Sequence, residues 1–146
     1  MRHGISLATA MFAFTLLLGS NAAAASGYPG TYLTTRPGAQ GTQSIVLVLE
    51  PNGRATMTTA FPELVRNYGA GVLPVRETGT WRERGGNAEV RLTEIGLFHD
   101  GKLEKQRSEN KDFAFSRTGC RLSAVRYSKV LYGEAGLTFE KSGCTG

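Results

Sequence analysis

The chain has 146 residues, 17 of them Lys or Arg and 12 Asp or Glu, which gives a formal net charge of +5. This length is enough for one domain with a modest core. The basic residues are scattered and interleaved with acids rather than gathered into a stripe, which predicts a solvated basic surface and argues against a nucleic-acid partner.

The N-terminal residues have the order of a secretory signal peptide. A short basic start precedes the uncharged residues 4–19, and a run of small residues up to Ala25 follows. The uncharged stretch is shorter than the roughly twenty residues that a spanning helix needs. We therefore expect residues 1–25 to be a cleaved signal peptide and residues 26–146 to form a single domain, periplasmic or secreted. The residue after the expected cleavage site is not a cysteine, so we expect no lipid attachment and no stable membrane anchor.

Beyond the signal segment, short apolar or alternating runs recur between Gly, Pro, Asn and Asp, which is typical of an all-β domain. The first expected strand spans residues 30–35. The second, residues 44–50, is apolar on both faces, so we expect it to be central or covered on both sides. Residues 54–59 then return antiparallel after an Asn-Gly turn.

The next segment interrupts the strands. Pro62 can begin one helical turn over residues 61–66, and a glycine-containing stretch follows it. Strands are expected again over residues 75–82 and 88–93.

The second half of the chain begins less regularly. We expect short, poorly defined strands over residues 97–105 and a polar loop over residues 105–111. The last three expected strands span residues 112–116, 121–125 and 137–141. Alternation predicts that the following residues face inward: Ala55, Met57, Val90, Leu92, Phe113, Phe115, Leu122, Ala124, Leu137 and Phe139. About eight short antiparallel strands predict a small closed β-barrel, because closure removes exposed strand edges, with a two-layer β-sandwich as the alternative.

The chain contains two cysteines, Cys120 and Cys144. In an oxidising compartment such a pair is most simply one disulfide. A redox pair would normally be CxxC, and two sulfurs without a nearby histidine make a poor metal site. Cys120 precedes one expected strand and Cys144 follows the next, so antiparallel pairing would bring both to one edge of the sheet. The bridge should stabilise the fold by about 3 kcal/mol.

The sequence offers little catalytic chemistry. His99 is the only histidine beyond the signal segment, and we expect it to be an exposed turn residue. No HExxH, GxSxG, GxGxxG or P-loop motif occurs, so we expect no metal, no cofactor and no enzymatic activity. Glu77 and Glu94 could share an interior, which leaves an enzyme with an unrecognised site as an alternative.

Aromatic residues mark the candidate binding surfaces. A set that includes Phe98, Phe113, Phe115 and Phe139 could fill the barrel or line a mouth that holds a small apolar ligand. Residues 125–136 carry several apolar side chains, Val130 and Leu131 among them, which either cap the barrel or form a contact patch. The candidate binding residues are Tyr32, Trp81, Tyr127 and Tyr132.

The order of several short segments resembles the N-terminal domain of the NlpE-like envelope lipoproteins. The segments are Gly30-Thr31-Tyr32, residues 45–53 (IVLVLEPNG), residues 77–81 (ETGTW), residues 90–93 (VRLT) and residues 136–139 (GLTF). The resemblance implies a lipocalin-like barrel in the bacterial envelope, with roles in copper tolerance, surface sensing and envelope-stress signalling.

Two departures from this family limit what can be transferred. Residues 30–44 lack the CxxC pair that family members commonly carry after the first Gly-Thr, and the lipid-attachment cysteine is also missing. We therefore expect an exported, non-enzymatic binding module that acts in envelope homeostasis or stress and contacts an envelope protein. A carrier of a small hydrophobic ligand is the second expectation.

Overall fold

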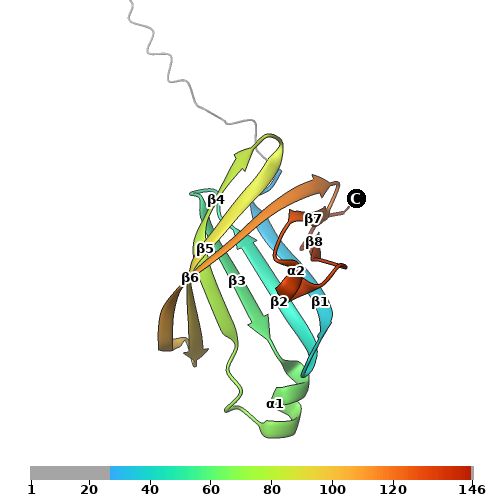
Figure 1. Cartoon of the computed structure of the whole chain (residues 1–146). Coiled ribbons are helices and arrows are strands. Elements are labelled where there is room, and N and C mark those ends of the chain that lie inside the picture. Colours follow the sequence, from blue (N-terminus) through green and yellow to red (C-terminus); the bar gives the residue numbers. More distant parts are fainter. Residues whose placement is uncertain (1–26, 146) are drawn as a thin grey trace, which may run out of the picture.

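The structure is a computed structural model that describes residues 27–145, so the expected signal peptide lies outside the described residues. Eight antiparallel strands form a closed barrel in which each strand pairs with the next and β8 returns to β1 (Figure 1). The strands are β1 (Gly30–Gly38), β2 (Gly41–Leu49), β3 (Arg54–Ala60), β4 (Val75–Arg84), β5 (Asn87–His99), β6 (Lys102–Thr118), β7 (Arg121–Arg126) and β8 (Thr138–Lys141). The predicted barrel is confirmed, and the alternative sandwich is not formed.

The connections alternate between two ends of the barrel. The turns β2–β3, β4–β5 and β6–β7 lie at what we call the closed end. The β1–β2 turn, the helix α1 (Pro62–Tyr68), the β5–β6 turn and the helix α2 (Lys129–Tyr132) lie at the opposite, open end (Figure 1).

The first three strands form where the sequence predicts them, although β1 and β2 are longer than expected. Ile45, Leu47 and Leu49 of β2 are almost fully buried, and Ala55 and Met57 of β3 pack inward beside them. Val46 and Val48 lie on the outer face of the barrel and are only partly buried. Of the two alternatives expected for this strand, the central position is confirmed, since β2 pairs with both β1 and β3. Its two faces are not both covered, because a closed barrel buries only its inner face.

The interruption after β3 is the helix α1, which is longer than the single turn expected. Pro62 occupies its first turn, where backbone N–H groups have no acceptor within the helix, so the missing N–H of proline costs no hydrogen bond. Glu63 ties the helix to the neighbouring turn, since its carboxylate accepts hydrogen bonds from the backbone N–H of Thr42 at 3.2 Å and from the Thr42 hydroxyl at 3.0 Å.

Strands β5 and β6 are the longest, and two expectations for this part of the chain, the loop over residues 105–111 and an inward Phe98, are wrong. Residues 105–111 are not a loop but belong to β6, which pairs with β5 as far as the Asp100-Gly101 turn. Irregularities in this pairing between Leu92 and Glu94 and between Leu97 and Phe98 shift the alternation of faces. Phe98 consequently lies on the outer face under Arg76, whose guanidinium carbon is 4.1 Å from the ring centroid, and not in the interior as expected.

A third irregularity lies between Thr78 and Gly79, where β4 pairs with β5. A Cβ at position 79 would collide with the backbone carbonyl of Arg91, so the two strands approach more closely than a side chain would permit. Glycine is therefore required here for close backbone approach rather than for an unusual dihedral angle.

The hydrophobic core fills the barrel from the closed end to its middle. The rings of Phe113 and Phe115 lie 5.3 Å apart, and Phe139 packs edge-on against Phe115 with centroids 5.9 Å apart. Tyr32 is fully buried, and its hydroxyl donates a hydrogen bond to the carbonyl of Tyr28 at 2.6 Å. The predicted inward set is buried, with Ala124 partly so.

The short strand β8 completes the barrel with little pairing of its own. Two of its residues, Glu140 and Lys141, pair with β1, and three pair with β7. The predicted disulfide is confirmed: Cys120 and Cys144 are bridged, with their Cα atoms 5.7 Å apart. It fastens the chain end that follows β8 to the β6–β7 turn.

Candidate functional site

The barrel wall is incomplete at the open end. Strand β6 pairs with β7 only over residues 114–118, and β1 pairs with β8 only at Tyr32 and Leu33. Residues 102–112 of β6 and residues 34–38 of β1 therefore have no paired strand on this side, which leaves a gap in the wall. The helix α2 crosses this gap (Figure 1).

Side chains from both walls hold α2 in the gap. The guanidinium of Arg36 on β1 donates hydrogen bonds to the carbonyls of Leu131 at 3.3 Å and Tyr132 at 3.2 Å, and it stacks over the Tyr132 ring. From the other wall, the Lys111 ammonium donates a hydrogen bond to the Tyr132 hydroxyl at 3.2 Å. Tyr132 is 8% exposed and packs against Phe113, so it plugs the barrel above the core.

A buried ion pair lies directly beneath this plug. Lys111 Nζ is 2.5 Å from Oε2 of Glu77, and the two side chains are 16% and 4% exposed. Burial lowers the pKa of Lys111, but its hydrogen bond to Glu77 and the neighbouring groups outweigh that effect, and the net shift of its pKa is upward. The ammonium is therefore firmly protonated at neutral pH. Charges so placed have to be paired, because burial of an isolated charge is costly.

A second carboxyl adjoins the pair. Burial raises the pKa of Glu109 to about 8, and a hydrogen bond to Glu77 together with the negative charge of Glu77 acts in the same direction. Glu109 therefore carries a proton at neutral pH. We call Glu77, Glu109 and Lys111 the ionic cluster.

The pKa of Glu109 predicts a pH dependence of stability. The folded protein keeps this proton up to about pH 8, whereas the unfolded chain loses it near the ordinary value of 4.5. Between these values the folded state binds more protons than the unfolded state, so the free energy of unfolding should fall as pH rises. We expect Glu109→Gln, which cannot ionise, to be more stable than the wild type at pH 9 and to lose that advantage towards pH 5.

Thermal unfolding followed by circular dichroism between pH 5 and 9 measures this difference. Glu94→Gln is the matched control, because Glu94 is an exposed carboxylate on the outer face that accepts a hydrogen bond from Gln106. Parallel melting curves for the wild type and Glu109→Gln across this range would contradict the assignment.

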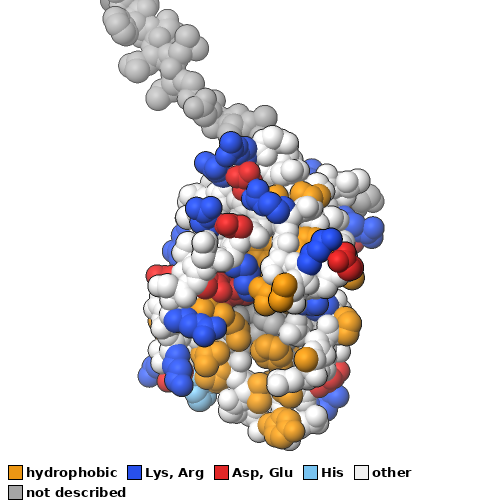
Figure 2. Space-filling view, in the orientation of Figure 1, with side chains coloured by type: hydrophobic (Ala, Val, Ile, Leu, Met, Phe, Trp, Pro, Cys, Tyr) orange, Lys and Arg blue, Asp and Glu red, His pale blue; other side chains and the backbone are white. Residues whose placement is uncertain are grey.

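Next to the ionic cluster lies a groove of about 520 Å³ on the inner face of β4, β5 and β6. Its apolar wall consists of Val75, Ile95 and Leu97. Val75 pairs with Leu97, and Ile95 pairs with Glu77, so the three side chains lie on the same face of the sheet as Glu77. Lys105 registers with Leu97 and Arg107 with Ile95, which places both cations along the same groove. Figure 2 shows basic side chains beside hydrophobic ones at the left of the lower half of the molecule. The groove thus combines an apolar wall with a cationic edge.

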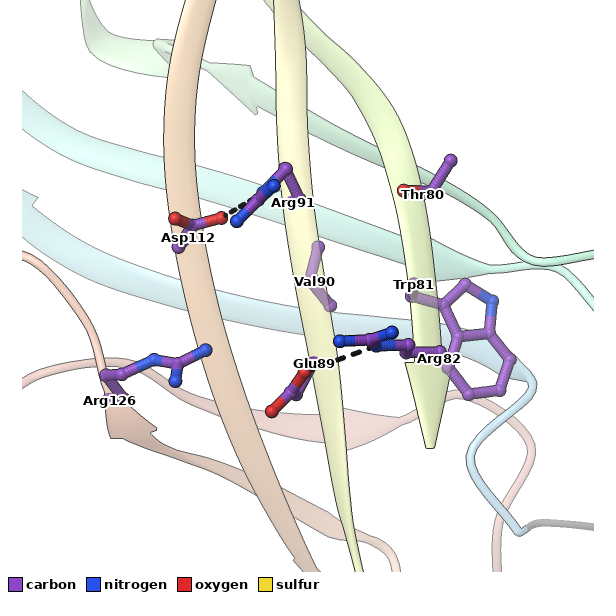
Figure 3. Close-up of a pocket in the computed structure, with 8 residues that line it drawn as sticks. All are labelled: Thr80, Trp81, Arg82, Glu89, Val90, Arg91, Asp112 and Arg126. Atoms are coloured by element: carbon purple, nitrogen blue, oxygen red, sulfur yellow. Dashed lines mark hydrogen bonds and ion pairs between the residues drawn. The ribbon is translucent and has the colours of Figure 1, made fainter. Parts of the chain in front are cut away.

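A second depression, of about 390 Å³, lies on the outer face of β4–β7 and is drawn in Figure 3. Its charged side chains largely neutralise each other: Arg91 pairs with Asp112 at 2.9 Å and Arg82 with Glu89 at 3.4 Å (Figure 3). Arg126 reaches it from the end of β7. Because its side chains are polar and mostly paired, this depression is a weaker candidate for binding a small molecule than the groove.

The candidate binding residues divide between the core and the open end. Tyr32 is a core residue, and Trp81 packs at the edge of the core, where its indole N–H donates to the carbonyl of Glu50 at 2.7 Å. Tyr127 and Tyr132 belong to the segment that crosses the gap, and the Tyr127 hydroxyl donates to the carbonyl of Glu134 at 3.1 Å. Of the four, only Tyr132 contacts the ionic cluster.

The residues considered for catalysis do not meet. Glu77 points into the barrel, Glu94 lies on the outer face, and His99 lies beside the β5–β6 turn with Asp100 and Glu104 as neighbours. The sequence interpretation missed Glu109 and Lys111, which stand in the segment taken for a loop. One signal in the sequence could have identified this strand and its charged face. Ionisable residues occupy every second position from Lys105 to Lys111, which is the period of a β-strand.

Among residues 27–145, no cluster of His, Cys, Asp and Glu is arranged to hold a metal ion. No helix in this described part is long and apolar enough to cross a membrane. Comparison with known proteins finds no matching family model, no matching curated protein and no matching solved structure.

Proposed function

We propose that this protein is an exported, non-enzymatic binding module whose open barrel end takes a small ligand with a substantial apolar part. The observation that carries the proposal is the groove beside the ionic cluster. It has an apolar wall in an otherwise packed barrel, and its volume falls within the roughly 300 to 1,000 Å³ of small-molecule sites. The open end of a barrel is a common place for such a site.

Export and the cellular role rest on the sequence. The order of residues 1–25 supports a cleaved signal peptide, and a disulfide is compatible with an oxidising compartment. The resemblance to the NlpE-like proteins supports a place in the bacterial envelope, with a role in homeostasis or stress. The absence of a CxxC motif from the sequence gives no support to a copper site.

Native mass spectrometry of the protein purified from a periplasmic extract tests the binding function. We expect a co-purifying small mass that disappears after denaturation and that is reduced in Leu97→Asn, which weakens the apolar wall. Arg91→Gln, on the outer face, is the control and should keep the full amount. A barrel that is empty in every preparation, including one incubated with a lipid extract, would contradict the proposal.

Exposed apolar side chains on α2 favour a protein partner as a second candidate function. Val130 is 96% exposed and Leu131 is 53% exposed, although Tyr132 of the same helix is buried. Such side chains favour a contact surface for an envelope protein. A partner retained by the immobilised domain should be lost from the Val130→Ser/Leu131→Ser variant, which leaves the plug residue intact. Retention that is unchanged in this variant would exclude α2 as the contact.

A further inference from the structure

We propose that the ligand is a single-chain amphiphile with an anionic head, a carboxylate or a phosphate, bound with its chain on the apolar wall and its head at Lys105 and Arg107. This inference rests on the proposed function and specifies the chemistry of the ligand. It follows from the distribution of charge along one face of one strand.

Every second residue of β6 from Lys105 to Lys111 is ionisable. From the open end inwards, the series is Lys105, Arg107, Glu109 and Lys111. The two inner members are already neutralised, because Lys111 pairs with Glu77 and Glu109 holds its proton at neutral pH. The groove therefore presents two positive charges near the open end and no net charge at its inner end.

The two outer cations are not committed to other contacts. Among the described residues, neither Lys105 nor Arg107 forms an ion pair or a side-chain hydrogen bond. The nearby acid Glu94 lies on the opposite face of the hairpin and accepts a hydrogen bond from Gln106. Arg107 thus keeps its bidentate donor geometry available for a carboxylate or phosphate.

The wall across from these cations is apolar. Leu97 registers with Lys105, and Ile95 registers with Arg107, so each cation stands beside a hydrophobic side chain on the same face. Val75 extends the apolar surface onto β4, opposite Leu97. A purely apolar ligand would gain nothing from the two cations, which are exposed and would stay hydrated, and a small anion without a chain would leave the wall exposed to water. An anionic amphiphile satisfies both.

Isothermal titration calorimetry with four probes of equal chain length tests this chemistry. The probes are dodecanoate, dodecyl phosphate, 1-dodecanol and dodecyltrimethylammonium, each kept below its aggregation concentration. We expect the two anions to bind about tenfold or more tightly than the alcohol, because a charge-assisted hydrogen bond is stronger than a neutral one. The cation should bind most weakly. The ratio between dodecanoate and dodecyl phosphate distinguishes a carboxylate ligand from a phosphate ligand.

Two variants of equal charge change locate the head group. In Lys105→Gln/Arg107→Gln the preference for the anions should disappear, while the affinity for the alcohol stays within about twofold, since the apolar wall is intact. Arg82→Gln/Arg91→Gln removes the same charge from the outer face (Figure 3) and should retain the preference. Equal affinity for anion and alcohol in the wild type would overturn the inference, as would equal losses in the two variants.

The two proposals fail in different ways. A neutral ligand found by native mass spectrometry, or a co-purifying mass from a protein that binds none of the anions, would overturn the anionic head and leave the binding function standing. A protein that co-purifies with no small molecule and binds none of the four probes would overturn both.

Discussion

Replacing Glu77 by Gln should lower the free energy of unfolding by about 3 kcal/mol, the largest loss that we expect from a single substitution at the open end. The change keeps the volume of the side chain but leaves the Lys111 ammonium, which is 16% exposed, without its carboxylate partner. We place the loss at the lower end of the range for a broken buried ion pair, because Glu109 is close enough to ionise and take over the pairing. Urea denaturation at pH 7 measures the difference.

Further variants separate the charge from the packing. Glu77→Gln/Glu109→Gln removes both carboxylates and should be less stable than either single variant. Glu77→Leu/Lys111→Met replaces the pair with apolar groups of similar size and should be close to the wild type in stability. Arg82→Gln is the control, because it breaks an ion pair on the exposed outer face and should cost less than about 1 kcal/mol. A loss below 1 kcal/mol in Glu77→Gln would contradict the buried pairing.

Loss of the disulfide should have the second large effect. Cys120→Ser/Cys144→Ser should reduce the free energy of unfolding by about 3 kcal/mol, the chain-entropy value for a loop closed across 24 residues. The reason is local as well as entropic. The bridge holds the end of β8, a strand of four residues that has only two paired residues with β1.

Hydrogen exchange measured by mass spectrometry locates this second effect. Residues 137–145 should exchange faster in the double serine variant, while the β2–β3 hairpin, which β1 separates from β8 and which has six register pairs of its own, should keep its protection at low denaturant. Reduction of the wild type with dithiothreitol should reproduce the result without any substitution. Unchanged stability after complete reduction would show that β8 is held by its hydrogen bonds alone.

The parts of the fold that could be predicted are those whose pattern is local. The β2–β3 hairpin has an Asn-Gly turn between an apolar run and an alternating run, and the disulfide requires only that the last two strands pair. Strand β6 was harder, because residues 105–111 are polar on both faces and so lack the hydrophobic alternation that marks a strand. Irregular pairing in β5 then shifted Phe98 to the outer face, which no count of alternate residues could anticipate.

The candidate site was predicted even less completely, for a related reason. Glu77 was a candidate from the sequence only as a carboxylate that could share an interior with Glu94, whereas its partners come from β6 and from α2, far along the chain. Their meeting depends on the barrel's closure and on the gap between β1 and β6. The gap exists because β7 and β8 are shorter than β6 and β1, and no sequence motif marks that difference. Tyr132 was selected as a binding candidate from its aromatic character, and its role as a plug depends on Arg36 across the gap.

The position of the chain ends has a practical consequence for handling the protein. Tyr28 donates a hydrogen bond to the carbonyl of Gly86 in the β4–β5 turn, and Cys144 is bridged to Cys120 in the β6–β7 turn. Both ends of the described chain are therefore fastened at the closed end of the barrel (Figure 1). The groove lies in the open half, along the parts of β5 and β6 that lead to the β5–β6 turn. A fluorophore, a fused domain or a sensor surface attached through either end would leave the groove facing solution. Immobilisation through either end would therefore orient the barrel with its open end away from the surface, which suits binding experiments on the groove.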